Sequence, residues 1–165
     1  GTDGGRGEVY LWDGQRLSET LSLDPGESSL DPDLRLGWEP DSRVSGMPGE
    51  GLGRALGVGD VDGDGDADLL VGAPFYNPLG TDDAYDSGAI FVFAGASRES
   101  RDTLWASAWS EAASEGTSAR RDVSSAEVWI TRAGAYLRTG QRFVVYDQNG
   151  DGQAEVALLN LQEPE

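Results

Sequence analysis

Residues 52 to 74, LGRALGVGDVDGDGDADLLVGAP, hold an acidic turn with an apolar run on each side. In the turn, Asp stands at positions 1, 3, 5, 7 and 9 of the segment 60 to 68. A hard cation such as calcium takes about 6 to 8 oxygen ligands, and alternate side chains of a short loop converge on its centre. Without a cation these charges would repel one another at close range. The turn therefore predicts a calcium site, and the alternative is a solvated acidic turn that holds no ion.

The expected ligands follow from the position of Asp at every second residue of the loop. We assign the side chains of Asp60, Asp62, Asp64 and Asp68 as ligands, and Asp68 is able to bind through both oxygens. Asp66 is expected to contribute its backbone carbonyl and to turn its carboxylate toward solvent.

A second loop, DQNGDGQAE at residues 147 to 155, keeps the same pattern. Its expected ligands are Asp147, Asn149, Asp151, Gln153 and Glu155. It carries one fewer charge among the four side-chain ligands, because Asn149 stands in the place of Asp62, so we expect it to bind calcium more weakly than the first loop. A loop without an ion is again the alternative.

The residues on either side of the two loops argue against an EF-hand. An EF-hand needs an acid at position 12 of its loop and a helix on each side. Position 12 is Val71 in the first loop and Leu158 in the second. The flanking runs are short and apolar, which is typical of strands, so each loop is expected to join two strands of a hairpin.

The same order of segments occurs twice along the chain. Residues 1 to 14 parallel residues 80 to 95, and residues 52 to 74 parallel residues 138 to 160. A weaker match sets residues 34 to 46 beside 104 to 116, with Trp38 and Trp109 in similar places. Strands are predicted at 8 to 12, 34 to 38, 53 to 59, 68 to 73, 89 to 93, 103 to 109, 141 to 147 and 155 to 161. Segments 15 to 33 and 110 to 137 are expected to be long connections, with an additional strand possible at 126 to 131.

Composition limits the functions that the chain can have. The formal net charge is −18 and no basic patch is evident, which excludes binding to nucleic acid or anionic membranes. Cys and His are both absent, which removes disulfides, thiolate zinc sites and two common catalytic groups. No apolar run reaches the length of about 20 residues that a membrane span requires. Carboxylate pairs resemble the acid and base of glycosidases, but nothing singles out one pair.

The run from Leu52 to Gly95 resembles an FG-GAP repeat, the blade unit of the β-propellers of integrin α-subunits. Leu52-Gly53 stands where the family has Phe-Gly, Gly72-Ala73-Pro74 matches its Gly-Ala-Pro, and residues 60 to 68 match its calcium loop. The later unit departs from the family, since it has Thr139-Gly140 for Phe-Gly and no Gly-Ala-Pro. The resemblance implies an all-β fold of β-propeller blades, each with four antiparallel strands.

On this resemblance the chain supplies about two blades. Residues 1–51 would form the third and fourth strands of one blade and a connection, residues 52–113 a complete blade, and residues 114–165 a connection and the first two strands of another. Each terminal blade would then be a half. Either the chain is cut from a longer propeller, or its half-blades are completed by other chains.

The expected function is that of a calcium-binding extracellular module for adhesion, with a protein or glycan as ligand and calcium in a structural role. An enzyme is not expected. The alternative is a structural protein that assembles into a ring, fibre or sheath. We expect the five Trp residues to pack between sheets, although they could line a sugar-binding surface. Asp82, Asp83 and Asp86 are expected to form a solvated loop, with a partner contact or a second cation as the alternative.

Overall fold

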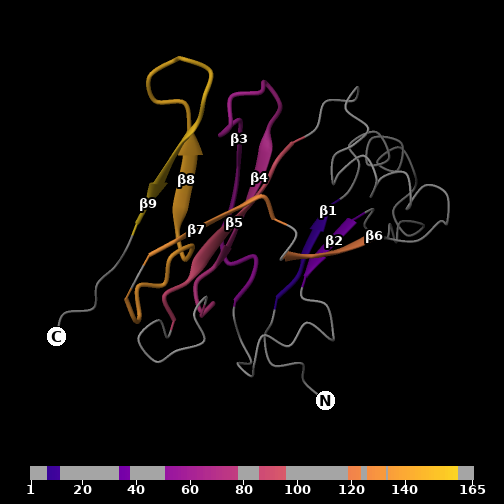
Figure 1. The fold of residues 1–165 in the computed structure, drawn as a ribbon, viewed down its shortest axis with the longest axis vertical. Helices are drawn as coiled ribbons and strands as arrows, with labels where there is room; N and C mark the ends of the chain where they lie inside the picture. Colours follow the sequence, from indigo (N-terminus) through magenta and orange to yellow (C-terminus); the bar gives the residue numbers. More distant parts are fainter. Residues whose placement is uncertain are drawn as a thin grey trace, which may run out of the picture.

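The structure is a computed structural model that describes residues 7–11, 34–37, 51–77, 86–95, 119–123, 126–132 and 134–159 (Figure 1). Within these ranges the regular elements are all β-strands, so the all-β prediction is confirmed. The strands are β1 (Val9–Leu11), β2 (Leu34–Gly37), β3 (Leu56–Gly59), β4 (Asp68–Ala73), β5 (Ala89–Phe93), β6 (Ala119–Asp122), β7 (Val128–Thr131), β8 (Phe143–Tyr146) and β9 (Glu155–Leu158).

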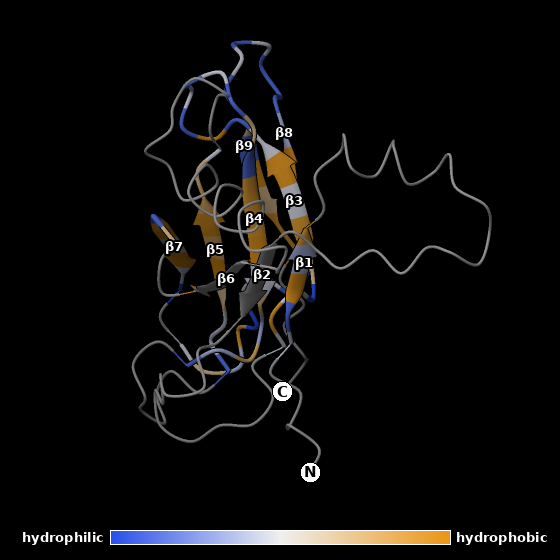
Figure 2. Ribbon diagram, turned by 90° about the vertical axis from the view of Figure 1, so that its right-hand side faces the viewer, coloured by the Kyte–Doolittle hydropathy of each residue, from blue (hydrophilic) through white to orange (hydrophobic). Residues whose placement is uncertain are grey.

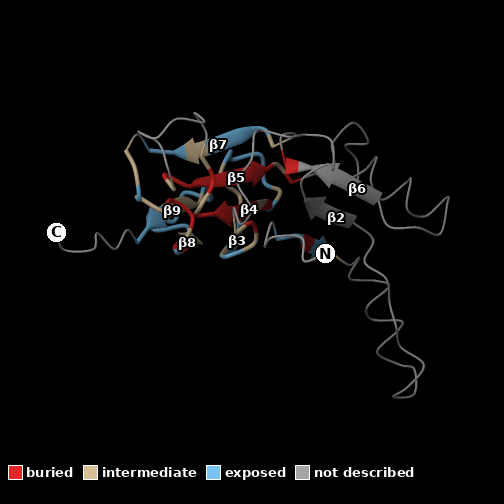
Figure 3. Ribbon diagram, turned by 90° about the horizontal axis from the view of Figure 1, so that it is seen from below, coloured by how far each residue is buried: buried red, intermediate tan, exposed pale blue. Residues whose placement is uncertain are grey.

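The centre of the molecule is a four-stranded antiparallel sheet with the order β3-β4-β5-β7 (Figure 1). Its two inner strands are apolar at almost every position, which is typical of strands that are buried on both faces. In Figure 3, β4 and β5 are buried, whereas β3 and β7 at the two edges are more exposed. The central sheet therefore has a packed layer on each side.

The alternation along β5 divides its side chains between two cores. Successive side chains of a strand point to opposite faces of a sheet. Phe91 and Phe93 accordingly belong to one hydrophobic cluster, and Ile90 and Val92 belong to another. Fully burying a side chain of this size stabilises a fold by about 1.5–3 kcal/mol, so both layers contribute substantially.

The layer on the Phe91 side is the sheet β1-β2-β6. β1 pairs antiparallel with β2, and β6 lies parallel to β2. Val9 of β1 and Val123, the residue after β6, are buried in the same cluster as Phe91.

The layer on the Ile90 side is the β8–β9 hairpin. Phe143 and Val145 of β8 pack with Ile90, and they also lie directly over β3. At Gly57 of β3 a Cβ atom would overlap both side chains. The absence of a side chain at this position therefore lets β8 approach the central sheet.

The junctions between successive sheets repeat along the chain. Gly88 has a φ of 73° and approaches the backbone of Thr139 so closely that a Cβ atom would overlap the Thr139 carbonyl. Gly7 has a φ of 78° and meets the carbonyl of Leu52 in the same way. The two junctions join equivalent positions of the repeated segments, so successive sheets are stacked in one consistent manner.

The fourth strand of the central sheet corrects one prediction. It was expected at 103 to 109, which lies outside the described residues, but the place beside β5 is taken by β7. The predicted boundary of the complete blade at residue 113 therefore falls before this strand. The Trp129 ring forms T-shaped contacts with Phe91 and Tyr76 at centroid distances of 5.4 and 5.9 Å, and these contacts help to hold β7 beside β5.

The predicted connection 110 to 137 contains β7, within the segment 126 to 131 where an additional strand was considered, and also β6, which was not predicted. Trp129 lies on β7 of the central sheet, where its ring contacts its cross-strand neighbour Phe91 and remains 42% exposed, so its packing between sheets stays a prediction. Trp12, Trp38, Trp105 and Trp109 lie outside the described residues. No helix in the described ranges has the length and apolarity needed to cross a membrane.

Candidate metal centre

The loop between β3 and β4 is held in shape by its own carboxylates. Asp60 accepts hydrogen bonds from the backbone N–H groups of Gly63 at 2.6 Å and Gly65 at 2.8 Å. The N–H of Asp64 donates to Asp62 Oδ1 at 3.0 Å, and the N–H of Asp66 donates to Asp64 Oδ1 at 2.8 Å. Gly63 and Gly65 have positive φ angles, 82° and 92°, so glycine suits both bends.

Asp68, the first residue of β4, ties this loop to the sheet. Its side chain is buried, with 1% of its surface exposed. Oδ2 accepts a hydrogen bond from Val61 N–H at 2.7 Å, and Oδ1 accepts one from Gly95 N–H at 2.7 Å. Since Gly95 follows β5, this one carboxylate fixes the loop relative to two strands.

The loop gathers three carboxylates around one point. Asp60, Asp62 and Asp68 each place a carboxylate oxygen within 4.8 Å of the other two. Asp62 is the exposed member of the group. Asp64 and Asp66 are part of the loop but not of this close cluster. The prediction that all five residues act as ligands stays a prediction.

The pKa of Asp62 reflects this crowding. The hydrogen bond from Asp64 N–H lowers the pKa of Asp62, but desolvation and the charges of Asp68, Asp64 and Asp60 raise it. The net effect is a pKa above the ordinary value for Asp. The electrostatic environment of Asp62 thus favours a positive charge beside it, whether a proton or a metal ion.

The loop between β8 and β9 repeats the first loop bond for bond. Asp147 accepts from the N–H groups of Gly150 at 2.6 Å and Gly152 at 2.9 Å, as Asp60 does from Gly63 and Gly65. Three further hydrogen bonds recur at equivalent positions, namely Gln148 N–H to Glu155 Oε2, Asp151 N–H to Asn149 Oδ1 and Gln153 N–H to Asp151 Oδ1. The two loops, which are identical at five of nine positions, therefore adopt one loop geometry.

The main difference between the loops lies at their third position. The side-chain amide of Asn149 donates to Asp151 Oδ2 at 3.0 Å and to Glu155 Oε1 at 3.2 Å. Asp62, at the same position of the first loop, has no N–H in its side chain to donate. The N–H groups of Gly152 and Gly150 lower the pKa of Asp147 below its ordinary value. At its third position the second loop thus has a side-chain donor for its carboxylates, and the first loop has a further carboxylate.

The two loops lie at the same end of the molecule and touch (Figure 1). Gln153 Nε2 donates to the backbone carbonyl of Asp62 at 3.1 Å, and Ala154 N–H donates to the carbonyl of Asp60 at 2.6 Å. Figure 2 shows this end as hydrophilic, above strands that are largely hydrophobic. Stacking of the β8–β9 hairpin on β3 therefore brings the two predicted sites together.

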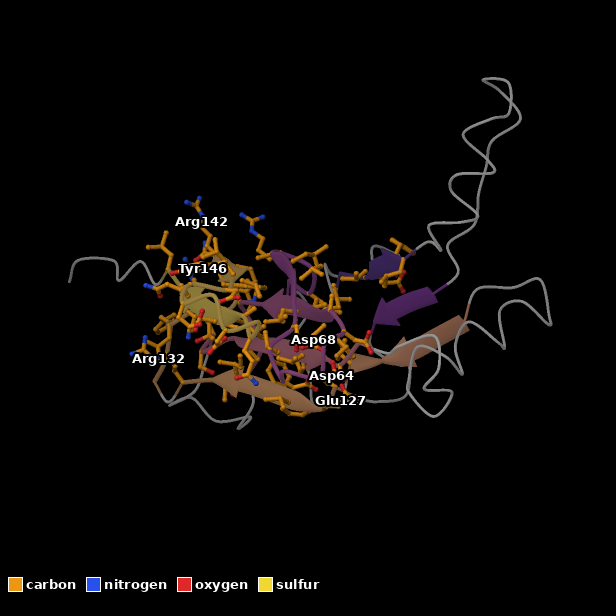
Figure 4. All side chains as sticks on the ribbon, turned by 90° about the horizontal axis from the view of Figure 1, so that it is seen from above. Asp64, Asp68, Glu127, Arg132, Arg142 and Tyr146 are labelled. Atoms are coloured by element: carbon orange, nitrogen blue, oxygen red, sulfur yellow. The ribbon has the colours of Figure 1, made fainter. Side chains whose placement is uncertain are left out.

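Two residues near the first loop were not singled out in the sequence. Gly95 binds Asp68, and Glu127, before β7, accepts a hydrogen bond from Ala94 N–H at 3.1 Å. Figure 4 shows Asp64, Asp68 and Glu127 close together when this end is viewed from above. No local pattern marks Glu127, because it approaches the loop only through the pairing of β7 with β5.

Asp86 is the described member of the predicted Asp82, Asp83 and Asp86 cluster, and the other two lie outside the described residues. Its backbone carbonyl accepts a hydrogen bond from Arg138 N–H at 2.9 Å. Burial raises the pKa of its carboxyl group, an effect that the positive charge of Arg138 partly offsets. Asp86 therefore belongs to the junction between two sheets, where its backbone binds Arg138.

The donor set of the first loop suits a hard divalent cation. All the gathered side-chain groups are carboxylate oxygens, which are the ligands that calcium and magnesium prefer. Backbone N–H groups already fix the carboxylates of Asp60 and Asp68, so these side chains are positioned in advance. The residues present therefore fit a metal ion at this position.

The stacked, mainly antiparallel sheets, with an acidic hairpin loop repeated at one end, define a propeller-like all-β fold built from repeats. The sequence profile of the FG-GAP repeat family matches residues 52–93. Integrin alpha-PS2 from Drosophila melanogaster is 47% identical over 45 residues, a match that covers 27% of this chain and 3% of that protein. The chain thus contains an FG-GAP repeat of the integrin-α type, which comprises β3, β4 and β5 together with the first acidic loop.

Proposed function

We propose that the chain is part of an extracellular, calcium-binding module of the integrin-α-like propeller type that serves adhesion through a protein or glycan ligand. One observation carries the calcium proposal. Both loops form the same set of five backbone hydrogen bonds to side-chain oxygens, and in the first loop this gathers three carboxylate oxygens within 4.8 Å.

Calcium in these loops would act on structure and not on chemistry. Its charge would offset the repulsion among the carboxylates of the first loop and thereby hold the β3–β4 turn rigid. Both oxygens of Asp60 and of Asp68 already accept backbone N–H groups, so these side chains are held in the loop rather than directed at a substrate. We therefore assign the chain no catalytic role.

The calcium proposal supports an extracellular location. Extracellular calcium modules often bind with dissociation constants of about 10⁻⁴ to 10⁻³ M, which suits the calcium concentration outside cells. The similarity to an integrin α-subunit supports this location and an adhesive role. Loops at the rigid end of the propeller would present the surface to the ligand.

Thermal unfolding with and without calcium tests the calcium proposal. At a free calcium concentration about 100 times the dissociation constant, one site adds about 2.7 kcal/mol, which corresponds to a rise in Tm of about 5 to 10 °C. The Asp62→Ala/Asp64→Ala double variant is expected to lose most of the rise that the first loop provides. Asp66→Ala is the matched control, because it leaves the backbone carbonyl in place. A calcium response that is unchanged in the double variant would refute the assignment.

A further inference from the structure

The third position of the second acidic loop holds an asparagine that is followed by a glycine. The chain has three Asn residues, and Asn149 is the one that precedes Gly. Asn77 precedes Pro78, and Asn160 precedes Leu161. Asn is a chemically labile residue, because the backbone nitrogen of the next residue is able to attack its side-chain carbonyl carbon. The residue that follows each Asn therefore determines how readily this attack occurs.

Gly150 offers the least hindrance to such an attack. It has no Cβ atom, and a Cβ atom built at this position would meet nothing within 4 Å. Asn77 cannot react in this way, because Pro78 has no N–H to lose. The residue after Asn160 carries a branched side chain next to the attacking nitrogen. Asn149 is therefore the most reactive Asn of the chain.

The folded loop keeps this dipeptide accessible and supplies an acceptor for the proton. Asn149 and Gly150 are both exposed, so water reaches them. The Gly150 N–H, which must lose its proton, donates to Asp147 Oδ1 at 2.6 Å. Gly150 has a φ of 79°, a conformation that glycine adopts without strain. The loop thus holds the reacting nitrogen at the surface and beside a carboxylate.

We propose that Asn149 is a site of spontaneous deamidation, which replaces the amide at the third position of the second loop with a carboxylate. The Gly150 nitrogen forms a bond to Asn149 Cγ, and the bond between Cγ and Nδ2 breaks. The proton of the Gly150 N–H passes to Asp147 Oδ1, and Nδ2 takes up a proton and leaves as ammonia. Water then opens the resulting succinimide ring and leaves aspartate or isoaspartate at position 149.

Deamidation removes the feature that distinguishes the second loop from the first. The Asn149 amide donates to Asp151 Oδ2 at 3.0 Å and to Glu155 Oε1 at 3.2 Å. A carboxylate in its place loses both hydrogen bonds and repels the two acids. The third position then carries a negative charge, as Asp62 does in the first loop. The modified loop is therefore less stable without a cation.

The test follows the full chain during storage in warm buffer that contains chelator, with peptide mapping by mass spectrometry. The peptide that holds Asn149 is expected to gain about 1 Da with time, because OH replaces NH2. The peptides that hold Asn77 and Asn160 should keep their mass. A mass gain at Asn149 that is no faster than at Asn160 would overturn the inference. Because no metal ion takes part, this result is independent of the calcium proposal.

Gly150→Ala and Gly152→Ala form a matched pair of variants. Both glycines have positive φ angles, 79° and 94°, and open space around them, so Ala adds the same kind of backbone strain at each. Gly150→Ala places a Cβ atom beside the attacking nitrogen and should slow the mass gain. Gly152→Ala should gain mass at Asn149 as wild type does. Equal rates in the two variants would contradict the proposed reaction.

Asn149→Asp measures what the aspartate product does to the loop. In chelator we expect its Tm to lie about 2 to 4 °C below that of wild type, because two hydrogen bonds are lost. Wild type stored until Asn149 is modified should show a similar fall. Asn149→Gln, whose longer side chain would have to close a larger ring, controls for other changes during storage. A modified chain that melts like fresh protein would overturn the effect assigned to the amide.

Discussion

At the scale of single residues, the third position of each acidic loop determines how the loop balances its charge. Asn149 donates its side-chain amide to two acidic neighbours, whereas Asp62 adds a further negative charge to the Asp60 and Asp68 pair. The second loop therefore satisfies part of its charge through the Asn149 amide, whereas the first depends more strongly on a cation. A comparison of the two loops therefore tests the role of the metal.

The substitution Asp62→Asn gives the first loop the side-chain amide that Asn149 provides in the second loop. Without calcium we expect a gain of about 1 kcal/mol, because repulsion is relieved and amide hydrogen bonds form. This corresponds to a rise in Tm of about 2 to 4 °C in excess chelator. In saturating calcium the order should reverse, because wild type offers one more charged ligand. A variant that is less stable than wild type under both conditions would contradict this account of Asp62.

The partly buried carboxyl group of Asp86 predicts how the stability of the fold depends on pH. Because burial raises the pKa of its carboxyl group, the folded protein binds this proton more tightly than the unfolded chain does. The contribution of Asp86 to the free energy of unfolding therefore falls as pH rises above about 4. Asn accepts the left-handed backbone at this position, where φ is 51°, and carries no charge.

We expect Asp86→Asn to have a higher Tm than wild type at neutral pH and the same Tm below about pH 4. Melting curves over this range, recorded in chelator, measure the difference. Curves that stay parallel at all pH values would show that Asp86 is not the source of the effect.

At the scale of structural elements, the junctions between sheets depend on glycine. We expect Gly88→Ala to destabilise the fold by about 2 to 5 kcal/mol, since the left-handed backbone and the overlap with Thr139 both add cost. Gly150→Ala has a similar φ of 79° but open space around it, so it should cost only about 1 to 2 kcal/mol. Chemical denaturation in chelator compares the two variants. Equal losses would mean that the close approach of Gly88 to Thr139 contributes nothing.

Strands that are buried on both faces were the easiest to predict. DLLVGA lies between the acidic loop and Pro74, AIFVF follows Gly88, and β4 and β5 begin and end where the sequence predicts. The fourth strand was placed wrongly because ARRD and VWIT lie in a long polar segment whose pairing depends on distant partners. β7 binds beside β5 through Trp129, and nothing near Trp129 in the sequence identifies that partner.

The candidate site, like the fold, was predictable from the sequence only in part. The alternating acids and glycines of each loop specify its geometry locally, so the position of both loops was predictable from the sequence. The contribution of Gly95 and Glu127 was not, because each reaches the site through pairing of strands that are far apart in the chain.

At the scale of the whole molecule, stacking of the sheets couples the two loops. Gln153 of the second loop holds the Asp62 carbonyl of the first. A net hydrogen-bond contribution of about 0.5–1.5 kcal/mol predicts that Gln153→Ala weakens calcium binding at the tighter site by about 2- to 10-fold. Calorimetric titration measures this affinity. Gln148→Ala is the control within the same loop, since the Gln148 side chain contacts Tyr146. Equal affinities in both variants and wild type would show that the loops act independently.

The central claim is that the two acidic loops hold calcium, and native mass spectrometry of the chain in calcium tests it most directly. We predict two ions per chain for wild type, one for Asp62→Ala/Asp64→Ala, one for Asp151→Ala, and none after chelation. A wild-type chain whose mass is the same in calcium and in chelator would contradict the claim, and so would two bound ions that persist in both loop variants.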